Sequence, residues 1–150
     1  MATLTLDQAA LIVDSGLEYG RQSGFKPLAI AVLDAGGHLL AFKRHESTGI
    51  LRADIAQGKA WGALGMGMGS RALAQRAETA PAFIASLASV SHGRVVPVPG
   101  GVLVRGPSGE ILGAVGISGD LPDNDEACAV YGIEQAGLVA DVGQAHPAKG

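Results

Sequence analysis

Two cationic residues, Arg52 and Lys59, stand seven positions apart in a segment rich in alanine and glycine. If this segment is a helix, that spacing places the two side chains about two turns apart along nearly the same stripe. Their charged groups could then bind one anion, and Arg44 could join them from the end of a preceding strand. Long cationic side chains on a solvated helix face would instead extend into water. The spacing leaves both interpretations open.

A group of carboxylates follows one glycine-containing loop near the end of the chain. Asp123 is placed to cap the helix that follows, and Glu126 would interact favourably with the positive N-terminus of that helix. Asp120 and Asp125 have no such explanation, so they are candidates for chemistry. If the loop that contains them faces an earlier glycine turn, exposed backbone N–H groups could bind a carboxylate. The residues expected to bind a ligand in this way are Gly100, Gly101, Ser118, Gly119 and Asp120.

The histidines are candidates for metal ligation and proton transfer. Neutral imidazole binds metals and haem iron, but no two histidines here have the spacing of a zinc site. His45 and His92 lie in connecting segments, where binding sites tend to form, whereas His146 lies in the C-terminal tail. Cys128 is the only cysteine, which excludes an internal disulfide, and a buried inert thiol is its expected state.

The elements that must position these residues follow from hydrophobic periodicity and turn residues. Thr5 and Gln8 form the pattern of a capping box at the start of the first helix, and Gly36 and Gly37 favour a tight turn between two strands. The predicted helices span about residues 6–23, 50–64, 70–78, 81–90 and 123–142. The predicted strands span about residues 28–33, 38–43, 95–98, 102–105 and 111–118.

The order of these elements indicates the architecture. The links between neighbouring strands are too short for parallel crossovers, so the strands should form an antiparallel sheet. We therefore expect an α/β (α+β) fold in which helices flank a five-stranded antiparallel sheet. No repeat or low-complexity linker divides the chain, so one domain over 1–150 is expected, with a core over about 4–142 and a tail over 143–150.

Composition limits the partners and the location of the protein. The net charge is −3 and the 11 Lys and Arg residues are scattered, which argues against nucleic-acid binding. The sequence shows no membrane span and no secretory signal, so a cytoplasmic location is expected. Aromatic residues make up only 4% of the chain while glycine reaches 23 residues. Because such a composition limits the core area, we expect a homo-oligomer.

Three stretches together resemble the GlcG/HbpS-like haem-binding family, and a fourth also fits its pattern. They are Ala31–Gly37 in the predicted hairpin, Lys59-Ala60 on the middle helix, Gly113–Gly119, and Asp125–Ala129 at the start of the last helix. The resemblance covers about residues 4–142. It implies a profilin-like fold, a homo-oligomer and, for some members, the binding or degradation of haem. Lys59 falls at a position that matches the family.

The sequence departs from the family pattern at two points. The chain has Arg44-His45-Glu46 where the family usually has Arg-Met-Asp after the second strand. It also has Gly100-Gly101-Val102-Leu103 where the family has Gly-Gly-x-Pro. These departures affect residues next to the expected site, so the ligand geometry of other members does not carry over directly.

Three functions fit these observations. The first is the binding of haem or a related tetrapyrrole, with His45 or His92 on the iron and cations on the propionates. The second is a cofactor-independent enzyme that acts on a small hydroxy- or oxo-acid in a catabolic pathway. The third is an oligomeric accessory protein without catalysis. Under the first two, Lys59 should anchor an anion in a pocket between the middle helix and the two glycine loops.

In the enzyme hypothesis, cations hold the substrate and other groups move a proton. Lys59 and Arg44 would bind the carboxylate of the substrate, while His92, Glu46 or Asp125 would act as the acid or base. This hypothesis requires the two cations and at least one of these three acid or base groups to reach one pocket.

Overall fold

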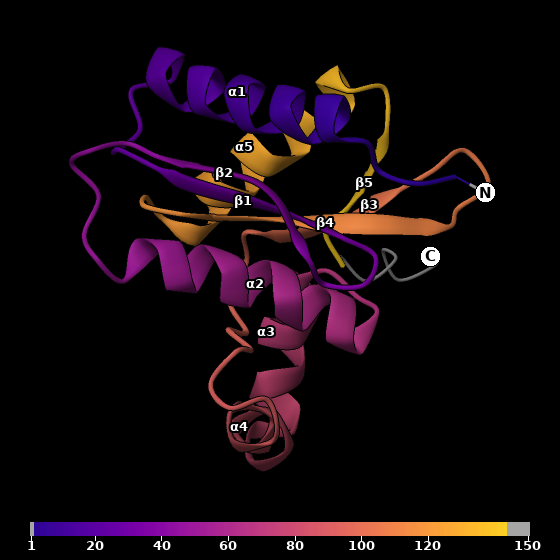
Figure 1. Cartoon of the computed structure of the whole chain (residues 1–150). Helices are drawn as coiled ribbons and strands as arrows, with labels where there is room; N and C mark the ends of the chain where they lie inside the picture. Colours follow the sequence, from indigo (N-terminus) through magenta and orange to yellow (C-terminus); the bar gives the residue numbers. More distant parts are fainter. Residues whose placement is uncertain (1, 144–150) are drawn as a thin grey trace, which may run out of the picture.

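The strands form one antiparallel sheet with the order β2-β1-β4-β3-β5 (Figure 1). The computed structural model describes residues 2–143. The five strands in that range are β1 (Ala29–Asp34), β2 (Leu39–Arg44), β3 (Gly101–Arg105), β4 (Ile111–Ser118) and β5 (Val139–Asp141). The expected α+β fold with a five-stranded antiparallel sheet is thus confirmed.

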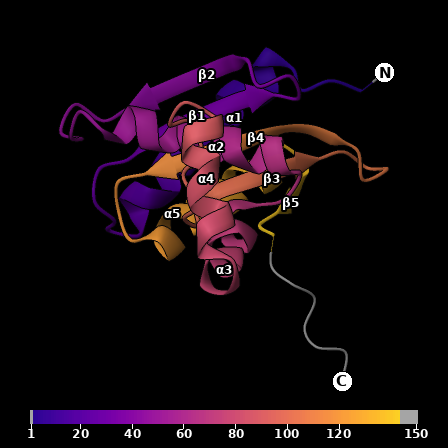
Figure 2. The same cartoon turned by 90° about the horizontal axis from the view of Figure 1, so that it is seen from below.

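Helices cover both faces of the sheet. They are α1 (Leu6–Gln22), α2 (Arg52–Met66), α3 (Ser70–Thr79), α4 (Pro81–Val90) and α5 (Pro122–Gln135). In Figure 1, α1 and α5 lie on one face, α2 lies on the other, and α3 and α4 project beyond α2. Figure 2 views the molecule from the side on which α3 and α4 project. Within residues 2–143, no helix has the length and apolar character needed to cross a bilayer.

The first helix and the hairpin match the sequence prediction closely. Thr5 caps α1 through its hydroxyl, and the side chain of Gln8 accepts a hydrogen bond from the Thr5 N–H in return. β1 pairs with β2 across the turn in which Gly37 has φ +85°, a conformation that suits glycine. The hairpin places Arg44 at the end of β2, opposite Ala29.

Helix α2 packs very closely on the central strand β4. A Cβ atom at Gly116 of β4 would overlap the carbonyl oxygen of Ala56 on α2. In the same way, a Cβ at Gly101 of β3 would overlap the carbonyl oxygen of Lys59. Backbone contact at these two points fixes the depth at which Lys59 enters the protein.

The predicted strand over 95–98 is wrong, and β5 supplies the fifth strand instead. The polar groups of 95–98 bond to helices: the Val96 N–H donates to the Gly58 carbonyl of α2, and the Val98 carbonyl accepts from the Ser70 hydroxyl of α3. Pro97 between them has no N–H to donate to a sheet. This segment therefore connects layers rather than extending the sheet.

Both predicted ends of the last helix also need correction. The helix stops at Gln135 instead of 142 because Gly137 adopts φ +77° and turns the chain into β5. At its start, Leu121 is the N-cap and Pro122 the first helical residue, so Asp123 is not the cap. Asp123 instead forms an ion pair with Arg71 of α3. Most of the predicted tail, with His146, lies outside the described residues.

Candidate functional site

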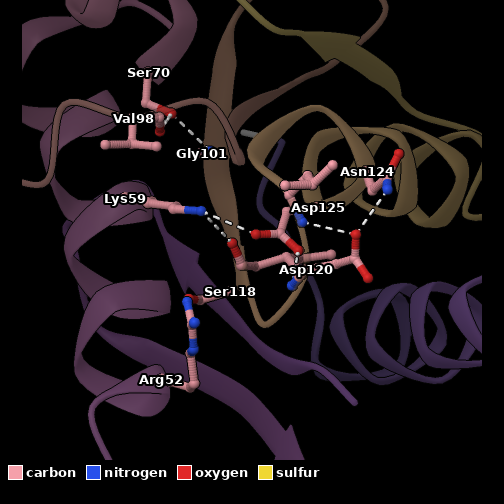
Figure 3. A network of polar contacts seen from close by, with 11 residues as sticks. Arg52, Lys59, Ser70, Val98, Gly101, Ser118, Asp120, Asn124 and Asp125 are labelled. Carbon is pink, nitrogen blue, oxygen red and sulfur yellow. Dashed lines mark hydrogen bonds and ion pairs between the residues drawn. The ribbon is translucent and has the colours of Figure 1, made fainter. Parts of the chain in front are cut away.

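A buried ion pair joins the helices on opposite faces of the sheet. Lys59 of α2 reaches past the end of β4 toward Asp125 in the first turn of α5 (Figure 3). Its Nζ lies 3.2 Å from Asp125 Oδ2 and donates to the Ile117 carbonyl oxygen at 2.9 Å. The two side chains are 3% and 1% exposed, respectively. Gly100 makes room for the ammonium, because a Cβ there would lie 2.8 Å from Nζ.

The loop before α5 completes this network through Asp120. The Asp120 N–H donates to Asp125 Oδ1 at 2.9 Å, and the Asp120 carboxylate accepts from the backbone N–H groups of Lys26 and Leu121 and from the side chain of Asn124. These hydrogen bonds, with the Lys26 N–H first among them, hold the pKa of Asp120 below its usual value. The network therefore fixes the loop between β4 and α5.

The predicted glycine loops do lie side by side, but the N–H groups of Gly101 and Asp120 donate to acceptors inside the protein. The Ile117 N–H donates to the Gly100 carbonyl, which brings the two loops together. The Gly101 N–H donates to the Ser70 hydroxyl at 2.7 Å, while the Asp120 N–H belongs to the network above. Ser118 accepts from Arg52 Nη1 at 2.9 Å. Arg52 and Lys59 therefore bind protein groups rather than converging on an open pocket.

Burial dominates the protonation behaviour of this interior site. It lowers the pKa of Lys59 and raises the pKa of Asp125, while the attraction between the two charges opposes both shifts. Burial also raises the pKa of the nearby Cys128 thiol to about 12, so this thiol is protonated at neutral pH. That agrees with the inert thiol expected from the sequence.

In the described part of the chain, Lys59 lines neither of two clefts that open on the surface. The first, of about 560 Å³, lies between α1, the loop before β1 and the end of β2, and we call it the α1–β2 cleft. Its lining residues are Asp14, Leu17, Glu18, Gly20, Arg21, Phe25, Lys26, Pro27, Leu28, Lys43, Arg44, His45 and Glu46. The second, of about 420 Å³, contains Trp61 and His92, and we call it the Trp61 cleft.

The proposed catalytic groups of the enzyme hypothesis are thus distributed over three places. Lys59 and Asp125 are in the interior, Arg44 and Glu46 line the α1–β2 cleft, and His92 lines the Trp61 cleft. The expected pocket beside Lys59 is replaced by an internal ion pair. The structure does not bring these groups to a common substrate position.

The α1–β2 cleft contains two cations without a carboxylate partner. Lys43 pairs with Asp14 at 2.7 Å, and Arg21 pairs with Glu18. Among residues 2–143, the side chains of Lys26 and Arg44 form no ion pair. Arg44 donates instead to the carbonyl oxygens of the two residues that follow it. Positive charge is therefore available in this cleft for an anionic ligand.

His45 stands at the edge of the same cleft with a half-exposed imidazole. Its Nδ1 accepts a hydrogen bond from the Ser47 N–H at 3.0 Å, and its Nε2 lies 3.6 Å from Glu46 Oε2. Phe25 and Leu17 line the cleft with apolar surface. The cleft thus combines an imidazole, apolar walls and unpaired cations.

Comparison with known families places the chain in one of them. A family model described as "Haem degrading protein HbpS-like" matches residues 4–134. The chain belongs to the HbpS-like family. The comparison of this HbpS-like chain with curated proteins gave no match.

Solved structures share the fold of this HbpS-like chain. A crystal structure of a PduOC:heme complex is 23% identical, with a TM-score of 0.82 over 91% of this chain and 97% of that one. A double mutant of HbpS from Streptomyces reticuli is 26% identical, with a TM-score of 0.78 over 90% and 88%. The Klebsiella pneumoniae protein ORFY is 23% identical, with a TM-score of 0.81 over 91% and 92%.

Several cleft residues of the HbpS-like chain were not predicted from its sequence. Phe25 and Lys26 follow the end of α1 and belong to no motif. The signal that could have pointed to them is an aromatic residue and a cation directly before a proline. Trp61 and Arg94 meet in the second cleft from distant segments. No local pattern connects those two residues, so only the fold could reveal their contact.

Proposed function

We propose that the protein binds haem or a related tetrapyrrole in the α1–β2 cleft. Haem is a flat, largely apolar ring with two propionate carboxylates and an iron that accepts axial ligands. The observation that carries the proposal is the combination of His45, two unpaired cations and apolar walls in one cleft. Membership of the HbpS-like family supports the same ligand class.

The chemistry of the residues present fits this group. Lys26 and Arg44 would pair with the propionates, because charge-assisted hydrogen bonds to carboxylates are the strong ones. His45 would ligate the iron through Nε2. Its proton must then be on Nδ1, so Nδ1 would no longer accept the hydrogen bond from the Ser47 N–H. When bound, haem would supply an iron centre for redox chemistry or for breakdown of the ring itself.

Substitution of His45 provides the test of this site. We expect hemin titration of the wild type to give a saturable Soret shift, and His45→Asn to weaken binding by about tenfold or more. Asparagine removes the iron ligand but keeps an acceptor for the Ser47 N–H. His92→Asn is the matched control, since asparagine tolerates the φ of +56° found at His92. Absorption spectroscopy at fixed ionic strength measures both effects.

The titrations also separate the ways in which the proposal could fail. If the wild type shows no Soret change, the protein does not bind haem. If His92→Asn loses binding while His45→Asn retains it, the haem site is in the other cleft. If binding survives both substitutions unchanged, histidine does not ligate the iron.

We also propose that the protein is a homo-oligomer. The glycine-rich composition with few aromatics supports this, and the helix α4 adds exposed apolar surface, with Phe83 46% and Val90 75% exposed. We expect light scattering at micromolar concentration to give a mass that is a multiple of the 15.1 kDa chain. A single species at the mass of one chain would contradict the proposal.

A cytoplasmic location also stays a prediction.

A further inference from the structure

The Trp61 cleft is a second, separate hollow that the haem proposal does not use. It lies between α2, the β1–β2 turn and the loop that follows α4, and it shares no lining residue with the α1–β2 cleft. The lining residues that matter here are Leu33, Leu39, Asp54, Trp61, His92 and Arg94. Leu33 and Leu39 supply apolar surface next to the indole of Trp61.

Arg94 is held in this cleft by its own surroundings. Its guanidinium carbon lies 4.0 Å from the centroid of the Trp61 ring, and its Nε donates to the Ser91 carbonyl at 2.9 Å. In the described part of the chain, Arg94 forms no ion pair, and neither Nη atom donates a hydrogen bond to a protein group. Stacking on Trp61 orders the guanidinium before a ligand binds. Its two unused Nη nitrogens can then donate to the two oxygens of a planar carboxylate.

The loop that carries Arg94 is fixed against α2 in a defined shape. His92 is the one non-glycine residue among the described positions with a positive φ, +56°. Gly58 of α2 lets the loop approach, because a Cβ there would lie 2.6 Å from Val96 Cγ2. The Gly58 carbonyl in turn accepts from the Val96 N–H. These contacts give the backbone of the loop a defined position against α2.

The remaining hydrogen-bond donors and charges of the Trp61 cleft limit the class of ligand that it can bind. Across residues 2–143, the Trp61 indole N–H has no hydrogen-bond acceptor among the protein groups, and neither ring nitrogen of His92 has a partner. Asp54 adds one negative charge to the lining, which offsets part of the attraction of Arg94 for anions and repels a ligand with two negative charges more than a ligand with one. The volume of about 420 Å³ suits a small molecule.

We propose that the Trp61 cleft binds a small planar organic monocarboxylate. The carboxylate accepts hydrogen bonds from the Nη groups of Arg94, and the apolar body of the ligand contacts Leu39 and Trp61. This site is independent of haem binding.

Trp61 itself reports on the experiment, because it is the single tryptophan of the chain. Haem-free protein is titrated with benzoate, and Trp61 fluorescence is followed together with the NMR signal of the indole N–H. We expect saturable binding at millimolar concentrations. Arg94→Gln should weaken benzoate by about tenfold, because it removes a charge-assisted, two-point contact. Arg94→Lys, which keeps the charge without the planar fork, should fall between Arg94→Gln and the wild type.

The controls decide whether Arg94 and the carboxylate group matter. Arg76→Gln changes an exposed arginine of α3 that forms no ion pair among the described residues, and it should bind benzoate like the wild type. His45→Asn should also leave benzoate binding unchanged. Benzamide, which has the same shape without the charge, should bind at least about tenfold more weakly. Equal binding of benzoate and benzamide, equal binding by the Arg94→Gln and Arg76→Gln proteins, or no saturable change would overturn the proposal.

Discussion

Lys59→Met should lower the free energy of unfolding by about 3–5 kcal/mol, because it leaves the Asp125 carboxylate buried without its countercharge. Asp125 is 1% exposed and would retain only the hydrogen bond from the Asp120 N–H. Methionine nearly matches the length of lysine, so the loss of packing should be small. Urea denaturation at pH 7 measures the difference in unfolding free energy between the variant and the wild type. The dependence of that free energy on urea concentration should be the same in both proteins.

Two further variants test whether the unpaired charge of Asp125 causes this loss of stability. Lys43→Met removes an exposed lysine from its ion pair with Asp14, and it should cost no more than about 1 kcal/mol. Lys59→Met/Asp125→Asn keeps an acceptor for the Asp120 N–H but removes the negative charge. This double variant should recover more than half of the loss. If it is no more stable than Lys59→Met, the uncompensated carboxylate is not the origin of the effect.

Gly116→Ala should lower the free energy of unfolding by about 3 kcal/mol or more, because the new methyl group would overlap the Ala56 carbonyl of α2. Both the strand and the helix would have to move, and neither backbone atom can rotate away as a flexible side chain would. Denaturant unfolding followed by circular dichroism measures this change.

Gly49→Ala is the matched control for Gly116→Ala. A Cβ at Gly49 meets no atom within 4 Å, and its φ is not in the left-handed region. We expect its unfolding free energy to stay within about 0.5 kcal/mol of the wild type. Similar losses in the two variants would show that α2 does not pack on β4 as tightly as described.

The sequence predicts the local elements of this fold well because their signals are local. The capping box at Thr5 and the glycine turn before β2 depend on residues within a few positions of each other. The apolar segment 95–98 misled the prediction, since its run of valines resembles a strand while its hydrogen-bond partners lie on α2 and α3. The stop of α5 before β5 was signalled by Gly137, which has the positive φ that ends helices.

The candidate sites depend on contacts that sequence spacing does not contain. Lys59 stood out as a cation among small residues, but its pairing with Asp125 joins two layers of the fold. His45 and Arg44 were expected near a ligand and do share a cleft, whereas Lys26 joins them only because α1 packs beside β2. The meeting of Trp61 and Arg94 likewise needs the loop to sit on α2.

The place of β4 in the middle of the sheet has a consequence for synthesis of the chain. β1 pairs with β4 over its whole length, Ala29 opposite Ser118 and Asp34 opposite Gly113. While the ribosome has made only the first half of the chain, β1 can pair with β2 and pack against α1 and α2, but the strand that covers its other edge has not yet been made. Pairing between strands so far apart in the sequence is slow, so the N–H and C=O groups on the β4-facing edge of β1 stay without strand partners until late in translation. We therefore expect this open edge to be the part of the partly synthesised chain that is most prone to pair with a strand of another chain.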